Sequence, residues 1–442
     1  MSTLGDQREA TQDEPADVRD GRGPTGLRRR FGRLAGDTAW ASSVEVLTLL
    51  CSLLAMYLIS TRLGPADYGQ FVGAQALAAT LGMFSYASVG QLLLQSIVRD
   101  RRSPDQVFAR CLSLLLATTT VSFALGIALR PLLFPDLSPW VFGLLVLAEL
   151  VGSGVVALGA SYLQALDAYR RSVVVRLLLL VVRALALLLL AMVGRLSLEA
   201  VAWSYGVLGL LAGTTVLAHL RLREQLPLRT SRPSRRDVRD TLSFAAALLS
   251  FSVHEDADKI LMVRLADPTS AGLYAAAYRA VQVALAPLRA LVSASHRRFL
   301  QHDPGRSGEH LQRSLKFSAG GAGYGFAAAI AVFVAAPLLP LALGSAYAGS
   351  VEMVRLLALL VLLRGLGVFC FNGLMGLRAH GARLLAVSSA ATAAAAGCGL
   401  LIPLWSWRGA AVATLVAELV FLSASWTALV LLQRRHDARL RS

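Results

Sequence analysis

The sequence predicts an all-α polytopic membrane protein with about 12 transmembrane helices, in two pseudo-repeated six-helix lobes around a central cavity. Three observations support this prediction. The 442-residue chain is 55% hydrophobic, has a mean hydropathy of +0.59 and has only 16% charged residues, whereas about a quarter of the residues of a soluble chain are charged. Apolar runs recur along its length, and a short repeat falls at equivalent places in its two halves.

Twelve apolar runs are each long enough to cross a bilayer, which takes about 20 residues of helix. Six of them precede a basic linker and six follow it. We expect the spans at residues 39–61, 72–94, 112–133, 139–163, 177–193, 201–220, 241–263, 271–293, 318–339, 351–371, 384–402 and 409–432.

The loops between these runs alternate in charge. Arginine is concentrated in loops at 99–110, 170–176, 221–239, 297–316 and 378–383, and each loop between them has at most one arginine. Because cytoplasmic loops carry the excess of Lys and Arg, we expect the N and C termini on the cytoplasmic side. The net charge of +16 then reflects orientation in a membrane, and we expect no nucleic-acid partner.

The loop composition also divides the chain. Residues 1–38 are polar and charged and lack the apolar core of a signal peptide, so we expect a disordered basic cytoplasmic tail. The N-lobe takes residues 39–220. A cytoplasmic interlobe linker with two prolines takes 221–240, and the C-lobe with a short basic tail takes 241–442.

A repeat supports this division into halves. Residues 62–71 follow the first expected span and residues 264–274 follow the seventh. Both segments read Arg-Leu, then Pro, then Gly four residues on, then an aromatic residue two further. A generic tight turn between helices also favours Pro and Gly, and that interpretation stays open.

A resemblance is carried by residues 62–71, by Tyr86-Ala87-Ser88-Val89-Gly90-Gln91, and by Asp258-Lys259 followed by residues 271–279. These segments resemble the polysaccharide or O-antigen (lipid-linked oligosaccharide) flippase family of the multidrug/oligosaccharidyl-lipid/polysaccharide (MOP) exporter superfamily. The resemblance covers nearly everything after the tail. It implies a V-shaped cavity between two lobes and alternating access. The implied cargo is an undecaprenyl-pyrophosphate-linked oligosaccharide, exported across the cytoplasmic (inner) membrane of a bacterium for lipopolysaccharide or exopolysaccharide biosynthesis.

The resemblance also implies partners and alternatives. The expected partners are the lipid-linked oligosaccharide, membrane lipids, and glycosyltransferases and a polymerase of the same pathway. A drug or cation antiporter of the same superfamily stays open, as does a peptidoglycan-precursor flippase, although precursor flippases usually have more spans than this chain can supply. A membrane-embedded polysaccharide polymerase or ligase resembles a different layout with a large external loop, and every expected outer loop here is short.

The seventh expected span holds an unusual group of charges. His254, Glu255 and Asp258 share one helix face, Lys259 flanks it, and Asp256 points elsewhere. Charged groups at bilayer depth persist mainly where they face a partner or a wet cavity. We expect this face to line the cavity and to couple transport to protons or sodium. Glu255 and Lys259 are spaced i, i+4, so a merely ion-paired structural patch stays open.

Arginines within spans form the second candidate site, because guanidinium groups suit phosphate oxygens. We expect Arg279, with Arg183 or Arg364, to hold the pyrophosphate. Glu149 is a rival partner for Arg183. Arg289 and Arg355 lie nearer the ends of their spans and reach for headgroups in this interpretation. Glu418 is isolated within its span and receives no role.

Enzymatic and metal-binding motifs are absent from the sequence. It contains no Walker-type phosphate loop, and His254-Glu255 lacks the second histidine of a zinc-protease motif. The four cysteines show no paired spacing. We therefore expect no enzyme, no catalytic residue, no metal site and no cofactor beyond the coupling proton or sodium ion.

Overall fold

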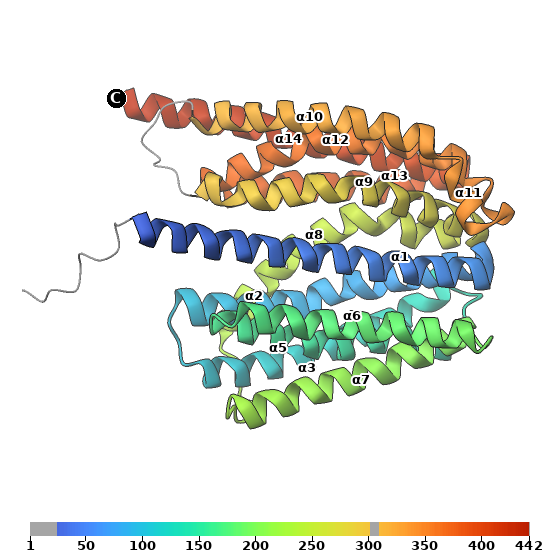
Figure 1. Ribbon diagram of the computed structural model, residues 1–442, viewed down its shortest axis with the longest axis horizontal. Coiled ribbons are helices and arrows are strands. Elements are labelled where there is room, and N and C mark those ends of the chain that lie inside the picture. The colour runs from blue at the N-terminus through green and yellow to red at the C-terminus, as the bar shows by residue number, and fades with distance from the viewer. Residues whose placement is uncertain (1–23, 301–308, 442) are drawn as a thin grey trace, which may run out of the picture. The chain divides into compact units, whose positions relative to one another are not determined.

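The computed structural model describes residues 24–300 and 309–441 (Figure 1), and every regular element in these ranges is helical. The elements are α1 Pro24–Gly82, η1 Met83–Ala87, α2 Ser88–Leu94, η2 Gln95–Arg99, α3 Pro104–Leu133, α4 Pro139–Leu147, η3 Ala148–Ser153, α5 Gly154–Ala165, α6 Tyr169–Met192, α7 Leu198–Arg223, α8 Arg235–Leu265, α9 Pro268–Leu300, α10 Glu309–Ala335, α11 Leu338–Leu343, η4 Ser345–Tyr347, α12 Ser350–Gly376, α13 His380–Trp405 and α14 Trp407–Arg441. Of these, η1, η2 and η3 are π-helical and η4 is a 3₁₀ helix.

Nine helices in the described part of the chain are long and apolar enough to cross a membrane. The first of them, 46–99, contains two expected spans, separated by a break in α1. The expected spans seven and eight correspond to α8 and α9, which are long enough but less apolar and are not among the nine. Together these segments account for all twelve expected spans, and the prediction of an all-α polytopic membrane protein is confirmed.

The chain divides into two compact units, residues 1–48 and residues 49–442. Within the first unit, α1 already begins at Pro24, because proline favours the first position of a helix, where its missing N–H is not needed. Residues 24–38 form the start of α1, residues 1–23 lie outside the described part, and the disordered tail stays a prediction. The division of the remainder into an N-lobe and a C-lobe stays a prediction.

The interlobe linker is shorter than expected. The non-helical stretch runs only from residue 224 to residue 234, since α7 extends to Arg223 and α8 begins at Arg235. Ser234 caps α8 by accepting a hydrogen bond from the backbone N–H of Asp237, whose carboxylate accepts one from the Ser234 N–H in return. This capping box satisfies two otherwise unpaired donors and fixes where α8 starts.

The two repeated segments contact each other. Gly64 breaks α1 with φ 80°, a conformation that glycine adopts readily, and Figure 1 shows the chain turning back after it. A Cβ atom on Gly69 would overlap the carbonyl oxygen of Pro268, and a Cβ atom on Gly272 would overlap the carbonyl oxygen of Pro65. The glycine of each repeat therefore packs on the proline of the other, which is the reciprocal contact expected of two equivalent hairpins.

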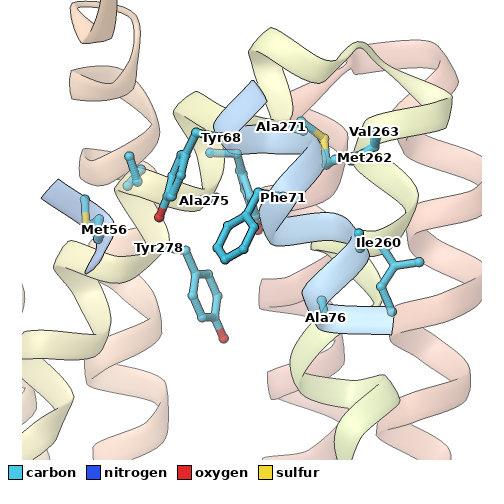
Figure 2. Packing of buried hydrophobic residues seen from close by; sticks show 14 of the residues in the cluster. Met56, Tyr68, Phe71, Ala76, Ile260, Met262, Val263, Ala271, Ala275 and Tyr278 are labelled. Carbon is cyan, nitrogen blue, oxygen red and sulfur yellow. The ribbon is translucent and has the colours of Figure 1, made fainter. Parts of the chain in front are cut away.

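Apolar side chains surround this contact. Figure 2 shows Tyr68 and Phe71 of α1 among residues of α8 and α9. The buried cluster labelled there comprises Met56, Tyr68, Phe71, Ala76, Ile260, Met262, Val263, Ala271, Ala275 and Tyr278. A further polar contact joins the two halves of the sequence, where the Tyr347 hydroxyl donates to the carbonyl oxygen of Ser60 at 3.1 Å.

Helix α8 occupies a special place among these elements. It packs against α9, α13 and α14 of the second half and also against η1, α2 and α3 of the first half. Its charged residues therefore lie where both halves of the sequence meet.

Candidate functional site

A buried polar network surrounds Asp258, which lies in the last third of α8. The Asp258 side chain is almost fully buried, and its Oδ2 accepts hydrogen bonds from the hydroxyls of Tyr274, at 2.8 Å, and Thr414, at 3.1 Å. Its Oδ1 accepts one from the backbone N–H of Lys259 at 2.8 Å. Three neutral donors from α8, α9 and α14 thus stabilise a carboxylate that the surrounding apolar helices would otherwise disfavour.

One helical turn earlier on α8, Glu255 belongs to a second group of charges. Arg364 of α12 lies between two carboxylates, with its Nη2 atom 2.7 Å from Glu255 Oε1 and its Nε atom 3.3 Å from Glu418 Oε2. The Nε2 atom of His254 lies 3.4 Å from the same Glu418 oxygen. The Nδ1 atom of His254 is buried without a hydrogen-bond partner.

Lys259 is the second cation of the network and pairs with Asp256 and Asp258. Its Nζ atom lies 3.0 Å from Asp256 Oδ1 and 3.3 Å from Asp258 Oδ1, and 3.8 Å above the ring of Tyr278. It also donates to the backbone carbonyl of Glu255, not to that residue's carboxylate. The alternative of an i, i+4 pair, which the spacing left open, does not form between the side chains of Glu255 and Lys259, and Asp256 joins the network through Lys259.

The network carries more negative than positive charge. Its four carboxylates are Glu255, Asp256, Asp258 and Glu418, and its two cations are Lys259 and Arg364. With a neutral His254, four negative and two positive groups give the network a formal charge of −2. Excess charge is expensive in a buried site, so such a network favours uptake of a proton or a small cation.

A separate cluster lies between η1, η3, α6 and α7 in the first half. Glu149, near the start of η3, accepts hydrogen bonds from Tyr86 at 2.8 Å, Ser153 at 2.9 Å and Gln75 at 3.3 Å. Its Oε2 atom also lies 3.8 Å from Arg183 Nη1.

Arg183 is held from several sides. It donates to the Ala148 carbonyl at 3.1 Å, and its guanidinium lies 4.8 Å from the centre of the Tyr205 ring. The competing expectation that Glu149 pairs with Arg183 is confirmed. Two of the three π-helical turns in the described residues, η1 and η3, supply a residue of this cluster, and such turns are frequent at functional sites.

Two arginines of α9 lie together without an acidic partner. Arg279 donates from Nη1 to the side-chain oxygen of Gln282 at 3.2 Å, and Arg289 donates from Nη2 to the backbone oxygen of the same residue at 2.9 Å. Among the described residues neither arginine has a carboxylate within ion-pairing distance. The two guanidinium groups therefore form a positive charge that no carboxylate in residues 24–300 and 309–441 neutralises.

The structure therefore separates the residues that the sequence grouped. The four expected residues of α8 do lie together, namely His254, Glu255, Asp258 and Lys259. Arg364 belongs to their network and does not lie with Arg279, with which the sequence had grouped it. Sequence reasoning missed Glu418, Tyr274, Thr414 and the second arginine, Arg289. An acidic residue isolated within a span was a usable signal for Glu418, because such a group needs a buried cation. The functional roles of all these residues stay predictions.

The start of α8 has its own ion pairs. Asp237 Oδ1 lies 3.0 Å from Arg102 Nη1, and Asp237 Oδ2 lies 3.7 Å from Arg110 Nη1. Burial raises the pKa of the Asp237 carboxyl, but the capping hydrogen bonds from Ser234 and the charge of Arg102 outweigh it and lower the pKa below its ordinary value. These contacts join the loop that follows η2 to the first turn of α8.

Comparison with known structures agrees with this fold. An inward-facing multidrug resistance MATE family transporter of the MOP superfamily matches with a TM-score of 0.68 at 15% identity, over 87% of this chain and 96% of that one. An outward-facing transporter of the same description matches with a TM-score of 0.59 at 15% identity, over 88% of this chain and 95% of that one. A third match is a MOP superfamily transporter from Pyrococcus furiosus Vc1 (DSM3638), which is described by the reverse polarity of its binding pocket. It matches with a TM-score of 0.57 at 16% identity, over 88% of this chain and 95% of that one.

The family comparison identifies the chain more closely. No curated protein matches it, but residues 34–295 match the family model of polysaccharide biosynthesis proteins. The structural neighbours are described as transporters. The multi-pass helical fold is that of the MOP superfamily transporters described above, and the chain belongs to the polysaccharide biosynthesis protein family.

Proposed function

We propose that this transporter moves a lipid-linked oligosaccharide, attached to undecaprenyl pyrophosphate, outward across the bacterial cytoplasmic membrane. Both termini face the cytoplasm in this proposal, in keeping with the alternation of arginine-rich loops. The observation that supports it most is the pair Arg279 and Arg289, which meet at Gln282 without a carboxylate partner among the described residues.

The pair suits a pyrophosphate for an energetic reason. An unneutralised charge within a span costs several kcal/mol, and that cost is offset when an anionic ligand supplies the missing charge. Guanidinium groups also donate two parallel hydrogen bonds to phosphate oxygens. A pyrophosphate carries enough negative charge to engage both arginines at once.

The other two arginines of the expected site take different roles in this proposal. Arg364 already contacts Glu255 and Glu418, so it belongs to the ion network. Arg183 contacts Glu149, but its Nε atom is buried without a partner. Arg183 is therefore kept as a secondary contact for the lipid-linked cargo.

The acidic network supplies the driving force in this proposal. Its net charge of −2 favours a proton or a sodium ion, and the oxygens around Asp258 come from both α8 and α14. Binding of the cation would weaken the attraction of Glu255 and Glu418 for Arg364, which belongs to α12. A change in the packing of α8, α12 and α14 would follow, and α8 would pass it to the first half through α2 and α3.

The reciprocal glycine contact between the two hairpins serves as the gate on one side. The hairpins touch at Gly69 and Gly272, so this end is closed here. Alternating access requires them to separate when the opposite end closes.

The test is transport in proteoliposomes of the full-length protein with a fluorescent polyprenyl-pyrophosphate oligosaccharide. The Arg279→Gln/Arg289→Gln variant should lose most transport. Arg195→Gln, which removes a positive charge from a loop outside the site, is the control and should transport like the wild type. Transport by the double variant at the wild-type rate would overturn the proposal.

A second function is favoured by one observation, the net negative charge of the α8 network. A drug or cation antiporter of the same superfamily would use those carboxylates to bind a cationic cargo. In the same proteoliposomes, uptake of an organic cation that Asp258→Asn abolishes, together with absence of lipid transport, would favour the antiporter.

A further inference from the structure

An apolar groove of about 830 Å³ lies on the second half of the chain, away from the network and the arginine pair. Its walls come from α10, α12 and the junction of α13 with α14. Phe326, Ile330 and Phe333 of α10 and Leu359 of α12 line it, and each is about half exposed, between 49% and 59%. In a multi-pass protein such an outward-facing apolar groove is in contact with lipid.

Arg355 lies in this groove and is exposed. It is five residues from the start of α12, which places it about 7.5 Å along the helix axis at 1.5 Å per residue. Its guanidinium lies 5.1 Å from the centre of the Phe333 ring. Among the described residues no carboxylate pairs with it.

The surroundings mark this end of the groove as the level of lipid headgroups. Trp405 and Trp407 line the groove beside Arg408, and tryptophan is enriched at the membrane–water interface. Arg408 is paired with Glu352 at 2.8 Å. The mouth of the groove therefore carries two positive charges and one negative charge, and Arg355 supplies the excess.

We infer that this groove is a binding site for an anionic phospholipid of the bilayer. The phosphate receives hydrogen bonds from Arg355, and one acyl chain lies along Phe326, Ile330 and Leu359. The charge at the mouth selects an anionic headgroup over a zwitterionic one. An exposed arginine that no carboxylate of the described residues pairs with gains an anionic partner in this way. The site is independent of the transported cargo.

The experiment is native mass spectrometry of the full-length protein released from nanodiscs that hold equal amounts of phosphatidylglycerol and phosphatidylcholine with identical chains. Wild-type protein should retain phosphatidylglycerol preferentially. Arg355→Gln should weaken that retention about tenfold, the change expected when a charge-assisted hydrogen bond is lost. Leu359→Trp should weaken it as well, because the indole fills the acyl end of the groove.

Two controls make the result decisive. Arg195→Gln removes the same charge from a loop outside the groove and should retain phosphatidylglycerol like the wild type, and the melting temperature of each variant verifies folding. Absence of a phosphatidylglycerol preference in the wild type would overturn the inference. So would an equal loss in Arg195→Gln, which indicates bulk attraction, or unchanged retention in Leu359→Trp, which indicates binding outside the groove. Cargo transport is a separate readout, so loss of the proposed function leaves this result intact.

Discussion

Replacing Arg364 with glutamine tests the energetics of the α8 network most sharply. Its side chain is 15% exposed and lies 2.7 Å from Glu255 and 3.3 Å from Glu418. Removing it changes the formal charge of the network from −2 to −3 and leaves two carboxylates without their cation. Removing one partner of a buried ion pair typically costs about 3–5 kcal/mol, and we expect Arg364→Gln to destabilise the protein by that amount.

The chain offers a matched control in Arg408, which is 2.8 Å from Glu352 but whose side chain is 62% exposed. An exposed pair contributes about 0–1 kcal/mol, so Arg408→Gln should lower stability by less than about 1 kcal/mol. Denaturant-induced unfolding in detergent micelles measures both variants. Adding Glu418→Gln to Arg364→Gln should recover part of the loss, since it removes one uncompensated charge. A cost below about 1 kcal/mol for Arg364→Gln would refute the assignment of a buried, charge-coupled network.

Three further results are expected. Gly272→Ala places a Cβ atom against the Pro65 carbonyl, so it should open the contact between the hairpins and speed the labelling of a cysteine introduced there. The control Gly320→Ala has open space around the new Cβ atom and should leave the labelling rate unchanged. Equal labelling rates in the two variants would count against the gate. The pKa of Asp237 is lowered in the folded protein, so the ionised carboxylate stabilises the fold fully above the unfolded pKa of about 3.9, and this stabilisation is lost as the pH falls below that value. Melting temperatures measured between pH 3 and 7 should show this loss for the wild type and not for Asp237→Asn. Asp258→Asn should make transport independent of proton and sodium gradients. If the variant keeps the gradient dependence of the wild type, Asp258 is excluded as the coupling residue.

The fold was predictable from the sequence because a bilayer constrains it strongly. Spans must be apolar and about 20 residues long, and arginine-rich loops alternate, so even spans seven and eight could be placed despite their charges. The start of the first helix at Pro24 was missed because the segment before residue 39 is too polar to be read as a span. The contact between Gly69 and Gly272 depends on how two distant hairpins meet, which the repeat alone does not specify.

The site was predictable only where neighbours in sequence are neighbours in space. Helical periodicity placed His254, Glu255 and Asp258 on one face. It also paired Glu255 with Lys259, whereas the Glu255 side chain reaches Arg364 on another helix. Partners more than a hundred residues apart leave no signal in periodicity. Counting unpaired charges within spans would have indicated that Glu418 needs a cation, although not which one.

The central claim is that Arg279 and Arg289 bind the pyrophosphate of a lipid-linked cargo, and the most direct measurement is a binding titration of purified protein with an undecaprenyl-pyrophosphate oligosaccharide. Each arginine contributes charge-assisted hydrogen bonds of about 1.5–3 kcal/mol. Arg279→Gln/Arg289→Gln should therefore weaken binding at least a hundredfold, while the monophosphate analogue should bind the wild type more weakly than the pyrophosphate. Equal affinity of the wild type and the double variant for the pyrophosphate lipid would contradict the account.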